Sequence, residues 1–170
     1  MLNTSIIRKL EKQLNKKEKK KTEKEIFELP EKYTKGLSKK EKKEKTENVK
    51  ESKELLKKDK KKEAFELAKK RPTTKEKKKS SYTIRFKKKF PDIKPQSKAM
   101  EKSTGIPLNA QKEVVKRGQG AFVSSGSRAS VGSPTQWGIS RLYAFYFKGI
   151  EKKLDFDKDL VKKYNIKFKK

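Results

Sequence analysis

The sequence predicts a mostly α-helical protein, in which a Lys/Glu-rich, partly extended helical arm precedes a small C-terminal domain. Hydrophobic residues recur at helical spacing between Ile139 and Ile150, the most regular amphipathic pattern in the chain. Residues 38–70 are dominated by Lys and Glu, which favour helices. The stretch SYTIRFKKKF alternates as a short strand does, so a small α+β domain stays open. We therefore predict a basic arm and linker over 1–80 and a compact domain over 81–170.

Composition points to a polyanionic partner. The 170 residues include 51 Lys and Arg against 22 Asp and Glu, a formal net charge of +29, and only 30% are hydrophobic. Such a charge repels itself unless an anion neutralises it, so we expect nucleic-acid backbone phosphates first, and an anionic membrane surface or an acidic protein surface after them. The chain has no cysteine and no histidine, which removes thiolate zinc sites and the commonest general base. No apolar run reaches ~18 residues, so no membrane span is expected.

The arm is expected to begin with an amphipathic helix over 3–21, followed by a hydrophobic anchor over 26–37. Ser38 and Glu41 have the spacing of a capping box, which opens a helix-prone region to about Lys70. This region is either a solvated helix with Glu/Lys pairs or a defined recognition helix. Pro72 then breaks the helix, and residues 69–81 are expected to form a basic linker.

The C-terminal domain is expected to contain three further elements. A short strand with a cationic face covers residues 82–87, and a small helix with Leu108, Val114 and Val115 inside ends at Gly118. Residues 118–133 are expected to be non-helical, with positive φ at the four glycines. Ser133 as N-cap and Pro134 at the first helical position then start a core helix to Lys148.

Candidate site residues are cations and hydroxyls that could bind phosphate. In the glycine-serine segment, arginines, hydroxyls and helix N-terminal amides combine into one anion site: Ser124, Ser125, Ser127, Arg128 and Arg141. Equally, Arg128 could tie the loop to Asp155 or Asp157. Further cations lie on the predicted strand and helix: Lys87, Lys88, Lys89, Lys116 and Arg117. Trp137 is either a core residue or a base-stacking platform.

Aspartates 155, 157 and 159 alternate as metal ligands can, but the glycine and terminal glutamate of a calcium loop are missing. Acidic residues near a helix N-terminus explain them more simply. The glycine-rich segment matches neither the phosphate-loop pattern nor the dinucleotide fingerprint. We therefore expect no metal and no cofactor.

Two stretches carry a family resemblance: YTKGLSKKEKK (Tyr33–Lys43) and KRGQGAFVSSGSRASVGSPTQWGISRLYAF (Lys116–Phe145). They resemble an uncharacterised family of basic proteins from large DNA viruses of algae and amoebae and from some phages. The second stretch is similar to the form K-G-x-G-A-[FY]-x-S-S-G-S-R-P-x-Q-x-x-x-S-W-G-x-[AS]-R-L, except that Ala129 stands where proline is usual. The resemblance implies a viral origin, hence a place in the virion, and in the host cytoplasm or nucleus during infection. It implies no activity.

Three functions follow as hypotheses. The first is a virion-associated protein that binds DNA or RNA non-specifically through phosphates, since no sequence-reading motif is present. The second is a minor capsid or internal structural protein acting as a strut between virion proteins. Fifteen acidic residues among 1–80 favour it, because charges of both signs give register to a protein interface. The third, an enzyme using the Ser/Gly/Arg loop, lacks histidine, cysteine and a convincing carboxylate pair, so we predict no catalytic activity.

Overall fold

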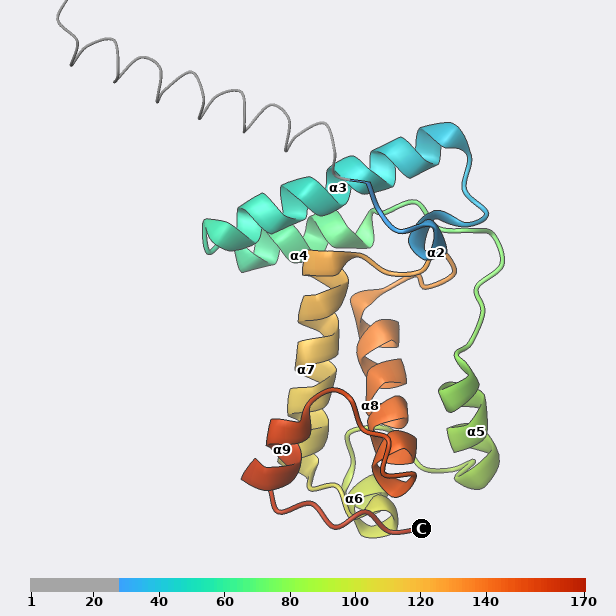
Figure 1. Cartoon of the computed structure of the whole chain (residues 1–170), viewed down its shortest axis with the longest axis vertical. Helices are drawn as coiled ribbons and strands as arrows, with labels where there is room; N and C mark the ends of the chain where they lie inside the picture. The colour runs from blue at the N-terminus through green and yellow to red at the C-terminus, as the bar shows by residue number, and fades with distance from the viewer. Residues whose placement is uncertain (1–27) are drawn as a thin grey trace, which may run out of the picture. The chain divides into compact units, whose positions relative to one another are not determined.

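The computed structural model of the chain describes residues 28–170 (Figure 1). The chain divides into two compact units, residues 1–30 and residues 31–170. The predicted helix over 3–21 and the anchor residues Ile26 and Phe27 lie outside the described residues. Within the described residues there are eight helices and no strand, so the mostly α-helical prediction is confirmed: α2 (Glu31–Thr34), α3 (Lys39–Lys57), α4 (Lys61–Lys69), α5 (Ser81–Lys89), α6 (Lys98–Thr104), α7 (Leu108–Ser125), α8 (Pro134–Ile150) and α9 (Lys158–Lys163).

The antiparallel pair α7 and α8 forms the centre of the second unit (Figure 1). The predicted core helix is confirmed as α8, because Ser133 Oγ accepts a hydrogen bond from the Gln136 N–H at 3.2 Å and Pro134 occupies the first turn. Its apolar stripe packs into a large cluster with α5, α6, α7 and the C-terminal segment. The buried members of this cluster are Phe86, Met100, Ile106, Ala110, Val114, Val115, Leu142, Tyr143, Phe145, Tyr146, Phe147, Leu160 and Ile166.

Gly118 and Gly138 lie at a close approach of α7 and α8. A Cβ atom at Gly138 would stand 2.6 Å from the Val115 carbonyl oxygen, and one at Gly118 would stand 2.7 Å from the Gly138 Cα. Both glycines are therefore required by close contact between helix backbones. Gly120, on the same helix, has no atom within 4 Å of its Cβ position.

The prediction that residues 118–133 are non-helical is wrong for the first half of that range. Helix α7 continues to Ser125, so Gly118 is not its C-cap, and only residues 126–133 form a loop. Of the four glycines, only Gly126 has a positive φ, +80°. The helix continues because Val114, Val115, Phe122 and Val123 are all buried on it, and this packing outweighs the low helix propensity of glycine.

The predicted strand at residues 82–87 is also wrong, since these residues form α5. Ser80 caps the helix by accepting a hydrogen bond from the Thr83 N–H at 3.1 Å. Tyr82, Phe86 and Phe90 recur every four residues and pack against α8, with the Phe86 and Tyr143 rings stacked at 4.1 Å. Ile84, which a strand would have placed beside Tyr82 and Phe86, is 58% exposed.

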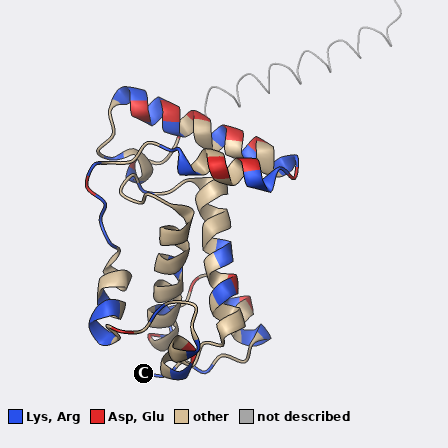
Figure 2. Cartoon of the chain, turned by 180° about the vertical axis from the view of Figure 1, so that it is seen from behind, with Lys and Arg blue, Asp and Glu red and all other residues tan. Residues whose placement is uncertain are grey.

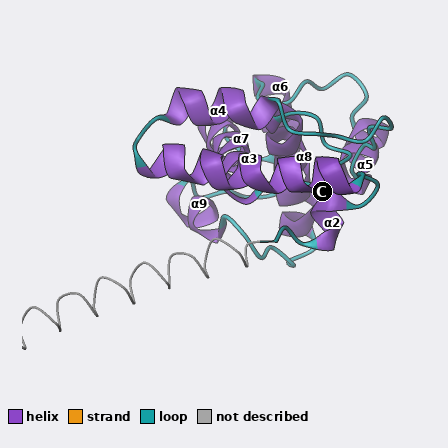
Figure 3. Cartoon of the chain, turned by 90° about the horizontal axis from the view of Figure 1, so that it is seen from above, coloured by secondary structure: helices purple, strands orange, loops and turns teal. Residues whose placement is uncertain are grey.

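Helices α3 and α4 lie side by side across the end of the central pair (Figure 3). The predicted capping box is confirmed: the Glu41 N–H donates to Ser38 Oγ at 3.3 Å, and the Ser38 N–H donates to a Glu41 carboxylate oxygen at 2.7 Å. A second cluster joins this layer to the end of α7, with Ala64, Ala68, Phe122 and Val123 buried in it. The described helices of the predicted arm thus belong to the same compact unit as the C-terminal part.

Arg71, directly after α4, attaches the α3–α4 layer to the C-terminus of α7. Its buried guanidinium donates hydrogen bonds to the carbonyl oxygens of Phe122 and Val123, the latter at 2.7 Å. It also donates to Asn48 Oδ1 at 2.7 Å and to Ser52 Oγ at 3.1 Å, both on α3. The Phe122 carbonyl also accepts the Gly126 N–H at 3.2 Å, so Arg71 adds a second donor there and a donor to the Val123 carbonyl, and its charge opposes the helix dipole.

Lys45 is the second buried cation in this region. Its side chain is fully buried on α3, and Nζ has no hydrogen-bond partner among the described residues. Burial, together with the charge of Arg71, lowers the pKa of the Lys45 ammonium to about 8. The fold therefore bears the cost of desolvating an unpaired amine.

No helix of the described residues is long and apolar enough to cross a membrane.

Candidate nucleic-acid interface

Two segments that are distant in the sequence lie side by side next to the N-terminal end of α8. The Thr74 N–H, in the lysine-rich segment 72–80, donates to the Ala129 carbonyl at 3.0 Å. Further along, the Lys77 side chain passes Gly132, with Nζ 3.1 Å from the position of a Cβ there. The basic linker therefore runs along the glycine-serine loop and brings its lysines beside Arg128.

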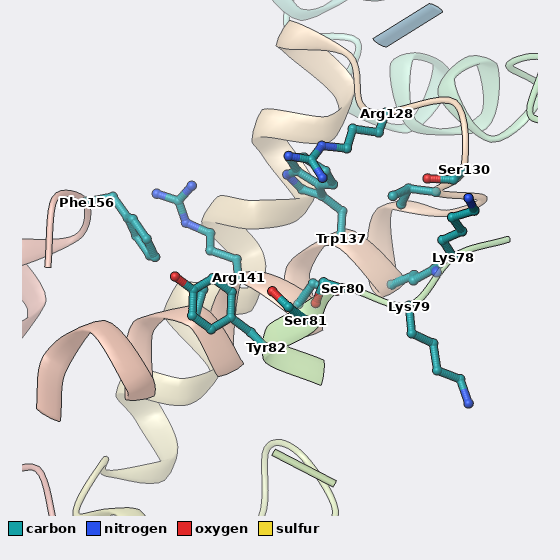
Figure 4. Close-up of a pocket in the computed structure, with 14 residues that line it drawn as sticks. Lys78, Lys79, Ser80, Ser81, Tyr82, Arg128, Ser130, Trp137, Arg141 and Phe156 are labelled. Carbon is teal, nitrogen blue, oxygen red and sulfur yellow. The ribbon is translucent and has the colours of Figure 1, made fainter. Parts of the chain in front are cut away.

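A cavity of about 550 Å³ opens between these segments, α5 and α8 (Figure 4). Four cations line it, and the remaining lining residues are hydroxyl, amide, aromatic or aliphatic, with no carboxylate among them: Lys78, Lys79, Ser80, Ser81, Tyr82, Arg128, Ser130, Val131, Gln136, Trp137, Ser140, Arg141, Ala144 and Phe156. Figure 4 places Arg128 and Lys78 toward one end and Phe156 toward the other, with Trp137 and Arg141 between them. The cavity thus combines positive charge with aromatic surface.

A second cavity, of about 660 Å³, adjoins the first and shares Lys78, Arg128 and Ser130 with it. Five cations and two carboxylates are among its lining residues: Lys32, Lys35, Gly36, Leu37, Glu41, Thr73, Thr74, Lys75, Glu76, Lys78, Arg128, Ala129 and Ser130. We call the two cavities together the basic groove. The YTKGLSKK box and the C-terminal motif, some ninety residues apart in the sequence, meet here.

The two arginines of the predicted anion site both line the first cavity, but only one of them is free. The Arg128 side chain is exposed, and its guanidinium makes no hydrogen bond or ion pair with any described residue. Arg141 is paired with Asp157, with nitrogen–oxygen distances of 2.8 and 3.0 Å, and its guanidinium lies 4.5 Å from the Phe156 ring centre. The expected tie to a C-terminal aspartate exists, but Arg141 makes it instead of Arg128.

The aspartates of the C-terminal segment are held by cations. Asp157, whose side chain is only 4% exposed, also binds Arg117 at 3.2 Å, and Arg117 reaches Asp159 at 2.6 Å. Hydrogen bonding to Arg117 lowers the pKa of Asp159, and Asp155 pairs with Lys148 at 2.6 Å. Among the described residues no group of three or more His, Cys, Asp or Glu side chains is arranged to hold a metal ion.

The other predicted site residues are spread over the molecule. Ser124 and Ser125, at the end of α7, have hydroxyls 3.4 Å apart, whereas Ser127 is buried and its hydroxyl has no partner among the described residues. Lys116 is exposed on α7, and Arg117 is occupied by the aspartates. The three lysines of α5 lie in its last turn, at the end away from the groove (Figure 1): Lys87, Lys88 and Lys89.

Trp137 has features of both a core residue and a base-stacking platform. It is half-buried, and it packs against the cluster of Ala64, Ala68, Phe122 and Val123. It also lines the first cavity.

Sequence reasoning did not select Lys78, Lys79, Tyr82 or Phe156 as site residues, although all four line the first cavity. The run KEKKKSS immediately before α5 is the sequence signal for the lysines. Because basic runs are most often solvated, the run alone does not identify a site. Tyr82 can be placed in the cavity only once residues 82–87 are known to be helical, and Phe156 only once its contact with Arg141 is known.

Comparison with known proteins gives a family but no activity. No curated protein and no solved structure is significantly similar to this chain. A family described as "Family of unknown function (DUF5824)" matches residues 30–161, which include both stretches on which the resemblance rests. These residues are most of the chain and most of its compact second unit. The chain therefore belongs to DUF5824, a family of unknown function.

Proposed function

We propose that this protein binds nucleic acid through the phosphate backbone, without reading base sequence, and that the basic groove is the centre of the binding surface. The observation that carries the proposal is the first cavity, which four cations line and no carboxylate does. Arg128 and Lys78 stand at the junction of both cavities, and Arg128 has no partner among the described residues that would compete with a phosphate. Exposed arginine and lysine side chains are the groups that most often contact phosphates.

The predominance of lysine supports phosphate contact over base reading. Exposed lysines outnumber exposed arginines around the groove, where the exposed cations are Lys32, Lys35, Lys75, Lys77, Lys78, Lys79 and Arg128. Lysine offers a mobile point charge, whereas base edges are read mainly by bidentate arginine, asparagine and glutamine. A binding role is further supported by the hydroxyls of Ser124 and Ser125, which lie 3.4 Å apart and hydrogen-bond each other instead of a general base among the described residues.

We further propose that the protein is a virion component of a large DNA virus or phage, as the resemblance of its two motifs implies. A second candidate, a strut between virion proteins, is favoured by the outer layer of α3 and α4, where Lys and Glu alternate over the surface (Figure 2). Detection of the protein in purified particles by mass spectrometry tests the location. Its absence from particles while it is abundant in infected cells would contradict it.

The binding proposal is tested by a charge-matched pair of variants of the full chain. In the first, Lys77, Lys78 and Lys79 are changed to Gln; in the second, Lys57, Lys58 and Lys62, exposed at the far end of α3 and the start of α4, are changed to Gln. Both lose three charges. Affinity for a labelled oligonucleotide is measured by anisotropy across a salt series. We expect the groove variant to bind about tenfold more weakly, with a shallower salt slope, and the control variant to stay within about twofold.

Equal losses in both variants would contradict the groove as the centre of binding. Binding by the unaltered protein that is weak and already lost at ~150 mM salt would contradict nucleic-acid binding as a whole. It would favour the strut, and capsid proteins would then be the partners to test by cross-linking.

A further inference from the structure

We infer that the basic groove selects single-stranded nucleic acid, and that its first cavity takes one unstacked base against Trp137 while Arg128 and Lys78 bind the adjoining phosphate. This inference rests on the proposed function and specifies its ligand. It starts from the unequal character of the two ends of the cavity (Figure 4). The free cations Arg128, Lys78 and Lys79 stand toward one end, and the wall toward Phe156 is neutral or aromatic apart from the paired Arg141.

At the Phe156 end of the cavity, the positive charge of Arg141 is already neutralised. Arg141 binds Asp157 through two nitrogens, at 2.8 and 3.0 Å, and one face of its guanidinium lies against Phe156. A ligand that reached this end would meet Trp137, Tyr82, Phe156 and Ala144 without a free cation. This surface suits a flat, uncharged group, whereas the rim at Arg128 suits an anion. A nucleotide unit joins these two chemistries, because its base is planar and its phosphate is charged.

Two considerations favour single-stranded over double-stranded nucleic acid: the size of the cavity, and whether the base is already stacked on its neighbours. A volume of about 550 Å³ is within the range of small-molecule sites, large enough for a base and its sugar but not for a duplex. In a duplex both faces of each base are stacked on its neighbours, so insertion would require unpairing and unstacking. A single strand presents its bases without this cost. Stacking on aromatic side chains tolerates any base, which agrees with binding that does not read sequence.

Trp137 provides a direct probe, since it is the only tryptophan in the chain. Stacking of a base on its indole quenches the fluorescence, so we expect a twelve-nucleotide oligothymidylate to quench Trp137 emission and to bind about tenfold more tightly than a duplex of the same length. The duplex is expected to bind through phosphates alone and to leave the emission nearly unchanged. Thymidine 5′-monophosphate at millimolar concentration should reproduce part of the quenching.

A variant that obstructs the cavity separates stacking from charge. Ser81 is exposed at the first position of α5 and lines the cavity, so Ser81→Phe adds bulk without altering any cation. We expect this variant to bind the single strand about as weakly as the duplex, and to bind the duplex as the unaltered protein does. Asn109→Phe, an exposed position near the start of α7, is the matched control and should change neither affinity.

The outcomes distinguish the inference from the function on which it depends. Salt-sensitive binding of both strand types with equal affinity, without quenching, would overturn the base pocket and leave phosphate binding standing. Absence of salt-sensitive binding to either would overturn the proposed function itself. Quenching by the duplex as strong as by the single strand would also contradict the inference, even if Ser81→Phe did not fold.

Discussion

Replacing Gly138 by alanine is expected to destabilise the protein by about 2–3 kcal/mol, because the new methyl group would stand 2.6 Å from the Val115 carbonyl oxygen. The obstructing atom belongs to the backbone of α7, so no side-chain rotation relieves the contact. The two central helices would have to move apart, and the cluster between them would lose packing. Urea denaturation followed by circular dichroism measures the change in the free energy of unfolding.

Gly120→Ala is the matched control, since Gly120 is in the same helix as Gly118 and has no atom within 4 Å of its Cβ position. We expect this variant to be stabilised by up to about 1 kcal/mol, because alanine favours the helix and restricts the unfolded chain. A Gly138→Ala variant as stable as the unaltered protein would show that the backbones of α7 and α8 do not approach each other this closely.

Replacing Lys45 by methionine is expected to stabilise the protein at pH 7, by about 3 kcal/mol. The folded state lowers the pKa of this ammonium from 10.5 to about 8, and a tenfold change in its proton affinity corresponds to about 1.4 kcal/mol. The unfolded chain holds the proton more tightly than the folded chain does. Below pH 8 the unaltered protein therefore bears the full cost of the buried charge, and between pH 8 and 10.5 it progressively regains stability.

The pH dependence of the stability difference distinguishes removal of the buried Lys45 charge from a general gain in packing. We expect the advantage of Lys45→Met to fall to less than half by about pH 9.5, in urea denaturation at about pH 7, 8.5 and 9.5. Tyr143, whose pKa burial raises, is present in both proteins and cancels in the comparison. Lys42→Met, at an exposed position of the same helix, should have little effect at any pH. A destabilised Lys45→Met variant would indicate that Nζ has a favourable partner in the folded protein.

The sequence is sufficient to predict elements whose boundaries are set by local chemistry. Ser38 with Glu41, and Ser133 with Pro134, start helices through hydrogen bonds among neighbouring residues, and both starts are confirmed. The mostly α-helical class follows from such signals together with the apolar periodicity of α8.

The errors arise where distant residues determine the local structure. In the sequence Gly118 resembles the end of a helix. Its actual role, close contact with Gly138 on α8, becomes visible only once the two helices are packed together. Residues 82–87 fit both a strand and a helix, and the aromatic rings of α8 decide between them. For the same reason, Arg128 and Arg141 are equivalent candidates in the sequence, although Asp157 engages only Arg141 of the two.

The meeting of the two motifs at the basic groove has a consequence for how this chain can be divided or recombined. Lys35 and Gly36 come from one motif, Thr74 from the segment between them, and Ala129 and Ser130 from the other, yet all line one cavity. A fragment that begins at residue 81 would lack most of that wall, and it would also lack Arg71, which donates hydrogen bonds to the Phe122 and Val123 carbonyls at the end of α7. We therefore expect residues 31–170 to be exchanged between relatives only as one unit. Exchanging either motif alone would pair lining residues of the cavity that come from different proteins.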